Sequence, residues 1–158
     1  MINNDSTLYE IKVWLYTRVT DGVRCPACHQ NAQIYRRPLH SGMARALIHI
    51  YKHRDADDKF NITTHRDTNK GDTSKLRFWG LIEQDEEDKR RGVWRITHDG
   101  KLFVERRMTV PGYAEIYDGE LLKIDGDPIT IRDALGKKFD YVELMRTTAT
   151  TDGDEVID

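Results

Sequence analysis

The sequence predicts an α+β fold, and three patterns carry that prediction. Apolar residues Met43, Leu47 and Ile50 recur with helical spacing, which indicates an amphipathic helix. Residues 93–97 alternate between apolar and polar side chains, as a half-buried strand does. An Asp118-Gly119 pair between two alternating runs is typical of a β-hairpin.

The length of 158 residues suits one domain with a small appendage. We expect four consecutive parts: an N-terminal helix with a Cys-x-x-Cys segment at 1–40, a main domain at 41–108, a C-terminal β-hairpin with short helices at 109–146, and an acidic tail at 147–158. The tail is polar and almost without apolar residues, so the sequence predicts that it is disordered.

The N-terminal part begins with Thr7-Leu-Tyr-Glu10, a sequence typical of a capping box. Residues 8–19 fit a helix, although Ile11, Val13 and Leu15 also alternate as in a strand, and we favour the helix. A turn is expected at 21–22, followed by Cys25-Pro-Ala-Cys28 and a short extended piece.

The main domain is expected to contain three helices and two strands. Ser41 is the predicted cap of the first helix, which should end near Arg54, and residues 59–69 suit short turns. Asp72 or Thr73 should cap the second helix, and Gly80 should end it. Further expected elements are a strand at 81–83, a charged loop at 84–92, a strand at 93–97 and a helix at 99–107 capped by Thr97.

The C-terminal part should open with a hairpin. Its strands are expected at 114–117 and 120–124, with a second turn at 125–128 because Asp-Gly-Asp-Pro is rich in turn formers. Short helices are expected at 130–136 and 139–145.

The order of elements from 41 to 107 resembles the winged helix-turn-helix domains of transcription regulators. The residues that carry this resemblance are Trp79-Gly-Leu-Ile-Glu83 and Gly92-Val-Trp-Arg-Ile-Thr97-His-Asp-Gly100. The resemblance implies that 41–108 is a winged-helix domain in which the helix before Gly80 reads DNA and the following hairpin is the wing. Such domains often bind paired half-sites as two-fold dimers, which implies a homodimer.

This resemblance implies a set of DNA-binding residues that are basic or small and polar. They are Lys70, Thr73, Ser74, Lys75, Arg77, Lys89, Arg90, Arg91 and Arg95. A helix can read base edges in the major groove while a basic loop follows the phosphates. Four consecutive acids at 85–88 oppose phosphate contact unless they point away, so a solvated face used for protein contacts remains the alternative.

Three further segments resemble uncharacterised proteins encoded by bacteriophages and prophages. They are Arg37-Pro-Leu-His-Ser41-Gly-Met-Ala-Arg-Ala-Leu, Asp72-Thr-Ser-Lys-Leu-Arg-Phe-Trp79-Gly-Leu-Ile-Glu and Ile131-Arg-Asp-Ala-Leu-Gly-Lys-Lys-Phe-Asp-Tyr141. This similarity implies a phage origin and a small accessory or regulatory role, and it brings no assigned activity. Besides a DNA-binding regulator, a module that binds or inhibits a host or phage protein fits, with the acidic residues 118–127 as its surface.

Cys25 and Cys28 have the spacing of half a zinc site, because thiolates on a tight turn can occupy adjacent tetrahedral corners. His49 and His53 are one helical turn apart and complete a Cys2His2 set for a structural zinc. The pattern also fits a pair of reduced thiols, a set in which His29 or His40 competes as a ligand, two chains pooling four Cys, or a Cys-x-x-Cys-His haem attachment.

Charge and motif content restrict the function classes. Residues 1–110 carry 20 Lys and Arg against 15 Asp and Glu, whereas residues 111–158 carry 5 against 12, so the body permits a nucleic-acid partner. No apolar run approaches the roughly 20 residues of a membrane span, and the N-terminus lacks the pattern of a secretory signal. We therefore expect a cytoplasmic protein, in the host cell if phage-encoded. Catalytic fingerprints such as phosphate loops and nucleophile elbows are missing, so we expect no enzymatic activity.

Overall fold

The computed structural model describes residues 2–64, 70–84 and 92–146. They form a mixed α+β fold with six α-helices, two 3-10 helices and three small antiparallel sheets. The helices are α1 (Leu8–Tyr16), α2 (Ser41–His53), η1 (Ile62–Thr64), α3 (Lys70–Lys75), η2 (Leu76–Trp79), α4 (His98–Val104), α5 (Ile131–Leu135) and α6 (Tyr141–Arg146). The strands are β1 (Val23–Arg24), β2 (Asn31–Ala32), β3 (Tyr35–Pro38), β4 (Lys59–Asn61), β5 (Ile82–Glu83), β6 (Val93–Ile96), β7 (Val110–Tyr117) and β8 (Glu120–Ile129).

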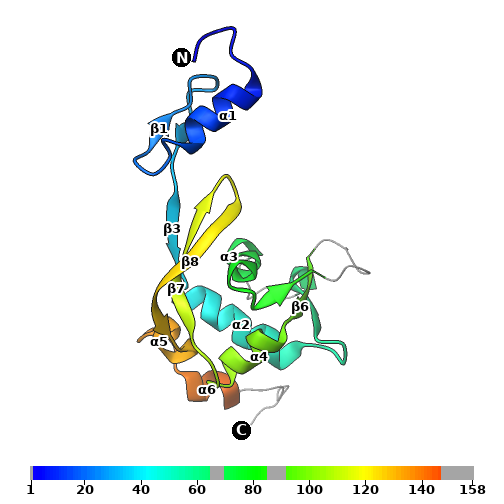
Figure 1. Cartoon of the computed structure of the whole chain (residues 1–158). Helices are drawn as coiled ribbons and strands as arrows, with labels where there is room; N and C mark the ends of the chain where they lie inside the picture. Colours follow the sequence, from blue (N-terminus) through cyan, green and yellow to red (C-terminus); the bar gives the residue numbers. More distant parts are fainter. Residues whose placement is uncertain (1, 65–69, 85–91, 147–158) are drawn as a thin grey trace.

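The molecule is elongated, with two unequal ends (Figure 1). Helix α1 and the paired strands β1 and β2 form a small unit at one end, which we call the N-terminal module. Helices α2, α4, α5 and α6 gather at the other end. Strand β3 and the β7–β8 hairpin lie between them. None of the helices in the described ranges is long and apolar enough to cross a membrane.

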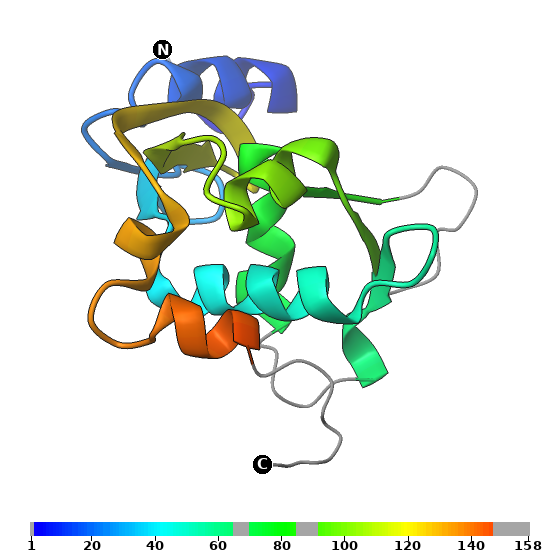
Figure 2. The same ribbon diagram turned by 90° about the horizontal axis from the view of Figure 1, so that it is seen from below.

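Helix α2 is the centre of the main core. Its residues Met43, Leu47 and Ile50 are almost fully buried, as their spacing predicts, and each such side chain contributes about 1.5–3 kcal/mol through removal from water. Seen from below, α6 runs beside α2 (Figure 2). The expected end near Arg54 is confirmed, but the cap is His40, whose Nδ1 accepts a hydrogen bond from the Gly42 amide at 3.1 Å. The prediction of a Ser41 cap is wrong because the helix already begins at that residue.

A three-stranded sheet, in the order β4-β6-β5, covers one side of this core. Strand β6 confirms the strand predicted at 93–97, although its burial does not alternate, since Val93, Trp94 and Ile96 are all buried. Strand β4 lies where the sequence suggested only turns. Phe60 of β4 is buried opposite Trp94 of β6, so a tertiary contact defines this strand. Its three residues are too short for a recognisable period.

The segment before β5 is one short helical unit, α3 followed by η2. It ends at Gly80, whose φ of +71° is the left-handed conformation predicted for this glycine. The expected start at Asp72 or Thr73 is wrong, because α3 begins at Lys70.

Helix α4 confirms the predicted cap. The Thr97 hydroxyl accepts a hydrogen bond from the Gly100 amide at 2.9 Å and donates one to the Gly80 carbonyl oxygen at 2.6 Å. Thr97 therefore links the start of α4 to the end of η2.

The sheet β3-β7-β8 joins the N-terminal and C-terminal parts of the chain. Strand β3 pairs with β7, with Tyr35 opposite Ile116. The predicted hairpin turn at 118–119 is confirmed, but the second turn at 125–128 is wrong. Strand β8 continues to Ile129, because Gly126 adopts a φ of +96° beside an irregularity in the pairing with β7 and lets the strand pass through it.

The N-terminal module has its own small core, made of Leu15, Val19 and Cys25 with partly buried neighbours. The helical interpretation of its first element is confirmed, since Thr7 and Glu10 form the predicted capping box. Tyr117, at the end of β7, packs against this core. The expected tail at 147–158 lies outside the described residues.

Candidate functional site

The candidate site is the outer surface of α3 and η2, which we call the α3–η2 surface. Leu76 and Trp79 are buried and fix this unit on the core. Ser74 and Lys75 are partly exposed and Arg77 is exposed, so these three predicted DNA-binding residues do lie at the surface.

Thr73 does not belong to this surface. Its side chain is 0% exposed, which contradicts the prediction that it faces DNA. The reason is geometric: Thr73 precedes the buried Leu76 by three residues and therefore shares its inward face.

Contacts within the chain hold the two cationic side chains of the α3–η2 surface. Arg77 Nη1 donates a hydrogen bond to the Ser74 carbonyl oxygen at 2.8 Å, and its guanidinium lies 4.3 Å from the centre of the Phe78 ring. Lys75 Nζ lies 3.9 Å from Asp72 Oδ1. Both side chains stay accessible to solvent. Lys75 keeps 36% of its side-chain surface exposed, and Arg77 is an exposed residue.

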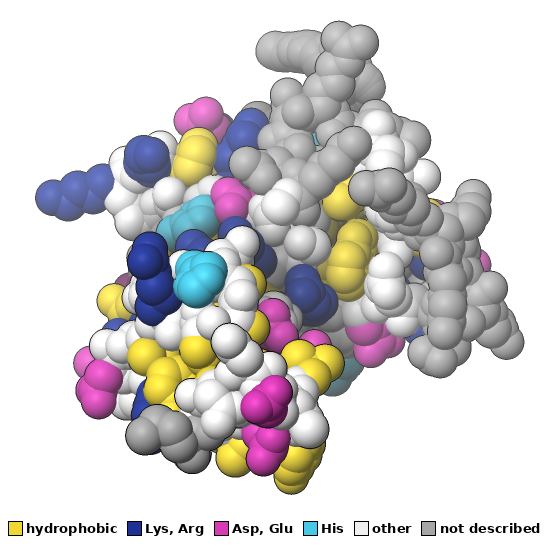
Figure 3. Space-filling view, turned by 90° about the horizontal axis from the view of Figure 1, so that it is seen from above, with side chains coloured by type: hydrophobic (Ala, Val, Ile, Leu, Met, Phe, Trp, Pro, Cys, Tyr) yellow, Lys and Arg dark blue, Asp and Glu magenta, His cyan; other side chains and the backbone are white. Residues whose placement is uncertain are grey.

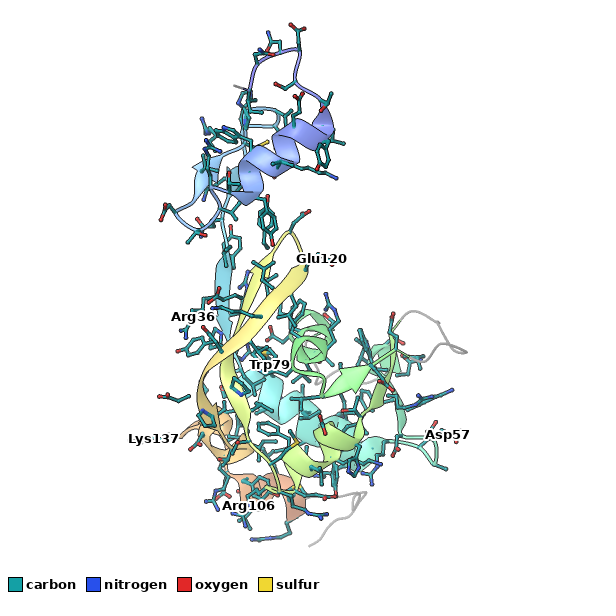
Figure 4. All side chains as sticks on the ribbon, viewed as in Figure 1. Arg36, Asp57, Trp79, Arg106, Glu120 and Lys137 are labelled. Atoms are coloured by element: carbon teal, nitrogen blue, oxygen red, sulfur yellow. The ribbon has the colours of Figure 1, made fainter. Side chains whose placement is uncertain are left out.

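Two hollows flank the α3–η2 surface. The larger, of about 640 Å³, lies between this surface and the tip of the β7–β8 hairpin, whose Glu120 is labelled above Trp79 in Figure 4. It is lined by Arg77, Phe78, Ile82, Glu83, Gln84, Trp94, Gly119, Glu120 and Leu121. Glu120, at the tip of the β7–β8 hairpin, therefore lines the same hollow as Arg77.

The smaller hollow, of about 110 Å³, brings in basic residues that the sequence did not predict. Arg37 and His40 line it together with Lys75. His40 Nε2 lies 3.6 Å from Asp72 Oδ1, so this carboxylate stands between the imidazole and Lys75. No local pattern marks Arg37 as part of the site, because it reaches this place only through the pairing of β3 with β7.

The predicted wing is described only at its base. Arg95 on β6 lies 3.4 Å from Glu83 on β5, so it closes the base of the hairpin. Lys89, Arg90 and Arg91 lie outside the described residues, as does the acidic run at 85–88. The backbone of Lys70 begins α3.

Charge is mixed at the end of the molecule that carries the N-terminal module (Figure 3). Seen from above, Lys and Arg side chains occupy several separate places, with Asp, Glu and hydrophobic side chains between them. Several guanidinium groups stack on aromatic rings; Arg36, for example, lies 3.7 Å from the centre of the Tyr113 ring. Stacked guanidiniums of this kind keep their charge available at the surface.

The predicted zinc set is not brought together. Cys25 and Cys28 lie in the β1–β2 hairpin of the N-terminal module, whereas His49 and His53 lie on α2 in the main core. Among residues 2–64, 70–84 and 92–146, no three His, Cys, Asp or Glu side chains are grouped so that they could hold a metal. The prediction of a Cys2His2 site is therefore wrong, because strand β3 separates the module from α2 (Figure 1).

The two histidines of that set instead interact with each other. Their rings stack with centres 4.2 Å apart, and His49 also meets the Phe60 ring edge-on at 5.5 Å. The pair therefore packs on the outside of α2 beside β4.

The cysteine pair keeps a distinct chemical environment. Hydrogen bonds from the backbone amides of Cys28 and Ala27 lower the pKa of the Cys25 thiol below its usual value. The Ala27 amide nitrogen lies 3.4 Å from Cys25 Sγ. Such bonds stabilise a thiolate, the form in which cysteine binds metals.

These features define two chemically distinct places, a cationic surface on α3–η2 and a thiol pair in the N-terminal module. Comparison with known proteins assigns neither place, since no protein-family model, curated protein or solved structure matches the chain.

Proposed function

We propose that residues 41–108 are a winged helix-turn-helix domain that binds double-stranded DNA in a regulatory or accessory role. The observation that carries the proposal is the connection of α3–η2 through Gly80 into β5, which pairs with β6 as an antiparallel hairpin. This is the relation between recognition helix and wing that the sequence resemblance implies.

The packing of α3–η2 supports its assignment as the recognition element. Thr73, Leu76 and Trp79 are buried on one face, and Lys75 and Arg77 project on either side of it, each lining a different hollow. A helix that enters the major groove needs such a division, because one face must stay fixed to the domain while the other reaches base edges or phosphates.

The contacts of Arg77 support a role in binding an anion. The hydrogen bond to Ser74 uses Nη1, and the ring of Phe78 supports the guanidinium from one side. The planar fork of an arginine suits bidentate contact with a phosphate or with a guanine edge. The neighbouring Arg37 and Lys75 extend the cationic surface toward β3.

The test is a fluorescence-anisotropy titration of the full chain with generic duplex DNA at several salt concentrations. A phosphate-binding surface gives a Kd that rises steeply with salt, and loss of one contact lowers the log–log slope by about one. We expect Arg77→Ala and Lys75→Ala each to weaken binding and reduce this slope.

Two variants outside the proposed interface serve as matched controls. Lys137 is labelled at the lower left of Figure 4, beside α5 and away from α3, and Arg107 is 68% exposed beyond the end of α4. Lys137→Ala and Arg107→Ala should bind like the parent. Absence of binding at low salt, or equal binding by all four variants, contradicts the proposal.

A second candidate function is protein binding by the β7–β8 hairpin. Leu121, Leu122 and Ile124 of β8 are each exposed by more than a third, next to acidic residues of the same strand. Exposed aliphatic side chains in a row are typical of interaction surfaces. If DNA binding fails, affinity purification from host lysate should recover a protein that Leu122→Lys no longer retains.

A further inference from the structure

The turn that carries the two cysteines is closed by backbone hydrogen bonds on both sides. Strands β1 and β2 pair with Arg24 opposite Asn31, and the Cys25 amide donates to the Gln30 carbonyl oxygen at 2.8 Å. The His29 amide donates to the Cys25 carbonyl oxygen at 2.9 Å, and His29 takes a left-handed φ of +64° to end the turn. The two thiols therefore belong to one hydrogen-bonded turn.

The direction of an amide in this turn suits a thiolate that binds a cation. The Ala27 amide points at Cys25 Sγ from 3.4 Å, inside the turn. Amide hydrogen bonds to a ligating sulfur are the outer contacts that hold thiolates in place around a metal. A thiol that served only as a small apolar side chain would need none of them.

The size of the N-terminal module gives a second, independent observation. Its core has three buried side chains, Leu15, Val19 and Cys25, and Tyr117 is the neighbour supplied by the hairpin. Units of fewer than about 40 residues usually need a metal, disulfides or association to be stable. A disulfide between Cys25 and Cys28 would close only one turn and would not join distant parts of the module.

We propose that Cys25 and Cys28 are half of a tetrahedral zinc site that the same two cysteines of a second copy complete. A structural zinc takes four ligands, and four thiolates are a common set. The chain contains two cysteines, and within the described part of it no third His, Cys, Asp or Glu side chain joins them. Cys28 is exposed, so a second copy can reach it.

The position of the module allows such a contact. It stands at the end of the molecule, away from the helices around α2 (Figure 4). On the side of α1 away from its core, Leu8, Tyr9 and Val13 are exposed by 46–76%. This apolar surface gives a second copy further area to bury.

The assembly is an acid–base reaction without oxidation. Zn²⁺ forms four Zn–S bonds as four thiols each lose a proton, and the resulting site carries a net charge of minus two. Arg24 borders the cysteine turn in each chain and provides nearby positive charge.

The experiment is native mass spectrometry of the full chain, purified without chelator in the presence of Zn²⁺, together with elemental analysis. We expect a dimer with one zinc for every two chains, and a monomer after the metal is removed. Replacement of zinc by Co²⁺ should give the intense absorption bands of tetrahedral cobalt with four thiolate ligands.

Cys28→Ser is the decisive variant, because this side chain is exposed and its loss should leave the core intact. It should abolish both zinc binding and the dimer, whereas His53→Ala, which removes an exposed member of the histidine pair, should change neither. A chain without zinc, a monomer with one zinc, or a Cys28→Ser variant that keeps its zinc overturns the proposal. None of these results depends on DNA binding.

Discussion

The indole Nε1 of Trp79 donates a hydrogen bond of 2.7 Å to the carbonyl oxygen of Pro111. This bond ties the end of η2 to the start of β7, and therefore joins the proposed DNA-binding helix to the sheet that supports the N-terminal module. Trp79 is 6% exposed and Pro111 is partly exposed, so the bond is partly shielded from water.

Trp79→Phe should destabilise the protein, because the ring is largely kept while the Pro111 carbonyl loses its partner. An unsatisfied buried acceptor costs about 1–3 kcal/mol of unfolding free energy. Urea unfolding of parent and variant measures the difference. Trp14→Phe is the matched control in the separate N-terminal core and should have a smaller effect on the main transition. Equal stability of Trp79→Phe and parent contradicts the prediction.

Gly100→Ala should destabilise the protein by crowding. A Cβ at this position would lie 2.2 Å from the Leu81 carbonyl oxygen and 2.7 Å from a side-chain carbon of Ile96. The backbone of α4 would have to move, at a cost of about 1–3 kcal/mol or more. Thermal unfolding should show a lower Tm for this variant. His98→Ala, at an exposed position of the same helix, should stay within about 0.5 kcal/mol of the parent.

Thr97→Ala should cost about 0.5–2 kcal/mol through loss of the helix cap, and more because the Gly80 carbonyl also loses its donor. Thr97→Ser keeps the hydroxyl and should recover most of this stability. Chemical denaturation of the three proteins gives the comparison. If the Ser and Ala variants are equally unstable, the missing methyl group rather than the hydrogen bonds is responsible.

Asp58→Asn should lower stability at neutral pH and have less effect in acid. The hydrogen bond from Lys101 Nζ, at 3.0 Å, is the main cause that lowers the pKa of Asp58, and the charges of Lys101 and Arg54 add to it. A carboxyl with a lowered pKa in the folded state contributes stability above its ordinary pKa and loses it as the pH falls through the lowered value. Asn keeps the left-handed backbone, with φ of +65°, that this position requires.

The size of the Asp58 effect should be modest. Its side chain is 30% exposed, so solvent screens the pair and about 0.2–1 kcal/mol is expected at neutral pH. Asp57→Asn, at an exposed neighbouring position, is the control, and its unfolding free energy should stay within about 0.5 kcal/mol of the parent. A difference between Asp58→Asn and parent that does not shrink in acid contradicts the assignment.

Local signals predicted several element ends correctly. The caps at Thr7 and Thr97 and the helix end at Gly80 all form as expected. Each depends on hydrogen bonds or backbone angles within about five residues, so the sequence contains the whole signal. The buried positions of α2 were also predictable, because the 3.6-residue period places them on one face.

Elements and sites that depend on distant segments were not predictable in this way. Strand β4 exists because Phe60 packs opposite Trp94, and Arg37 joins the α3–η2 surface because β3 pairs with β7. Because α3 begins at Lys70, Thr73 lies within the helix and on its buried face. A shift of one or two residues in where a helix begins changes which side chains face the core, and the sequence does not specify that start to within one or two residues.

The sequence by itself determined the α+β class, the main helix and the local geometry of the cysteine turn, since neighbouring residues specify each of them. Only the tertiary structure decided which of these elements meet. It placed Cys25 in a separate module, away from His49 on α2, because the short strand β3 spaces the module from the main core. The spacing of the two cysteines determines that one turn carries both thiols, whereas the packing of the chain determines which other ligands lie near them.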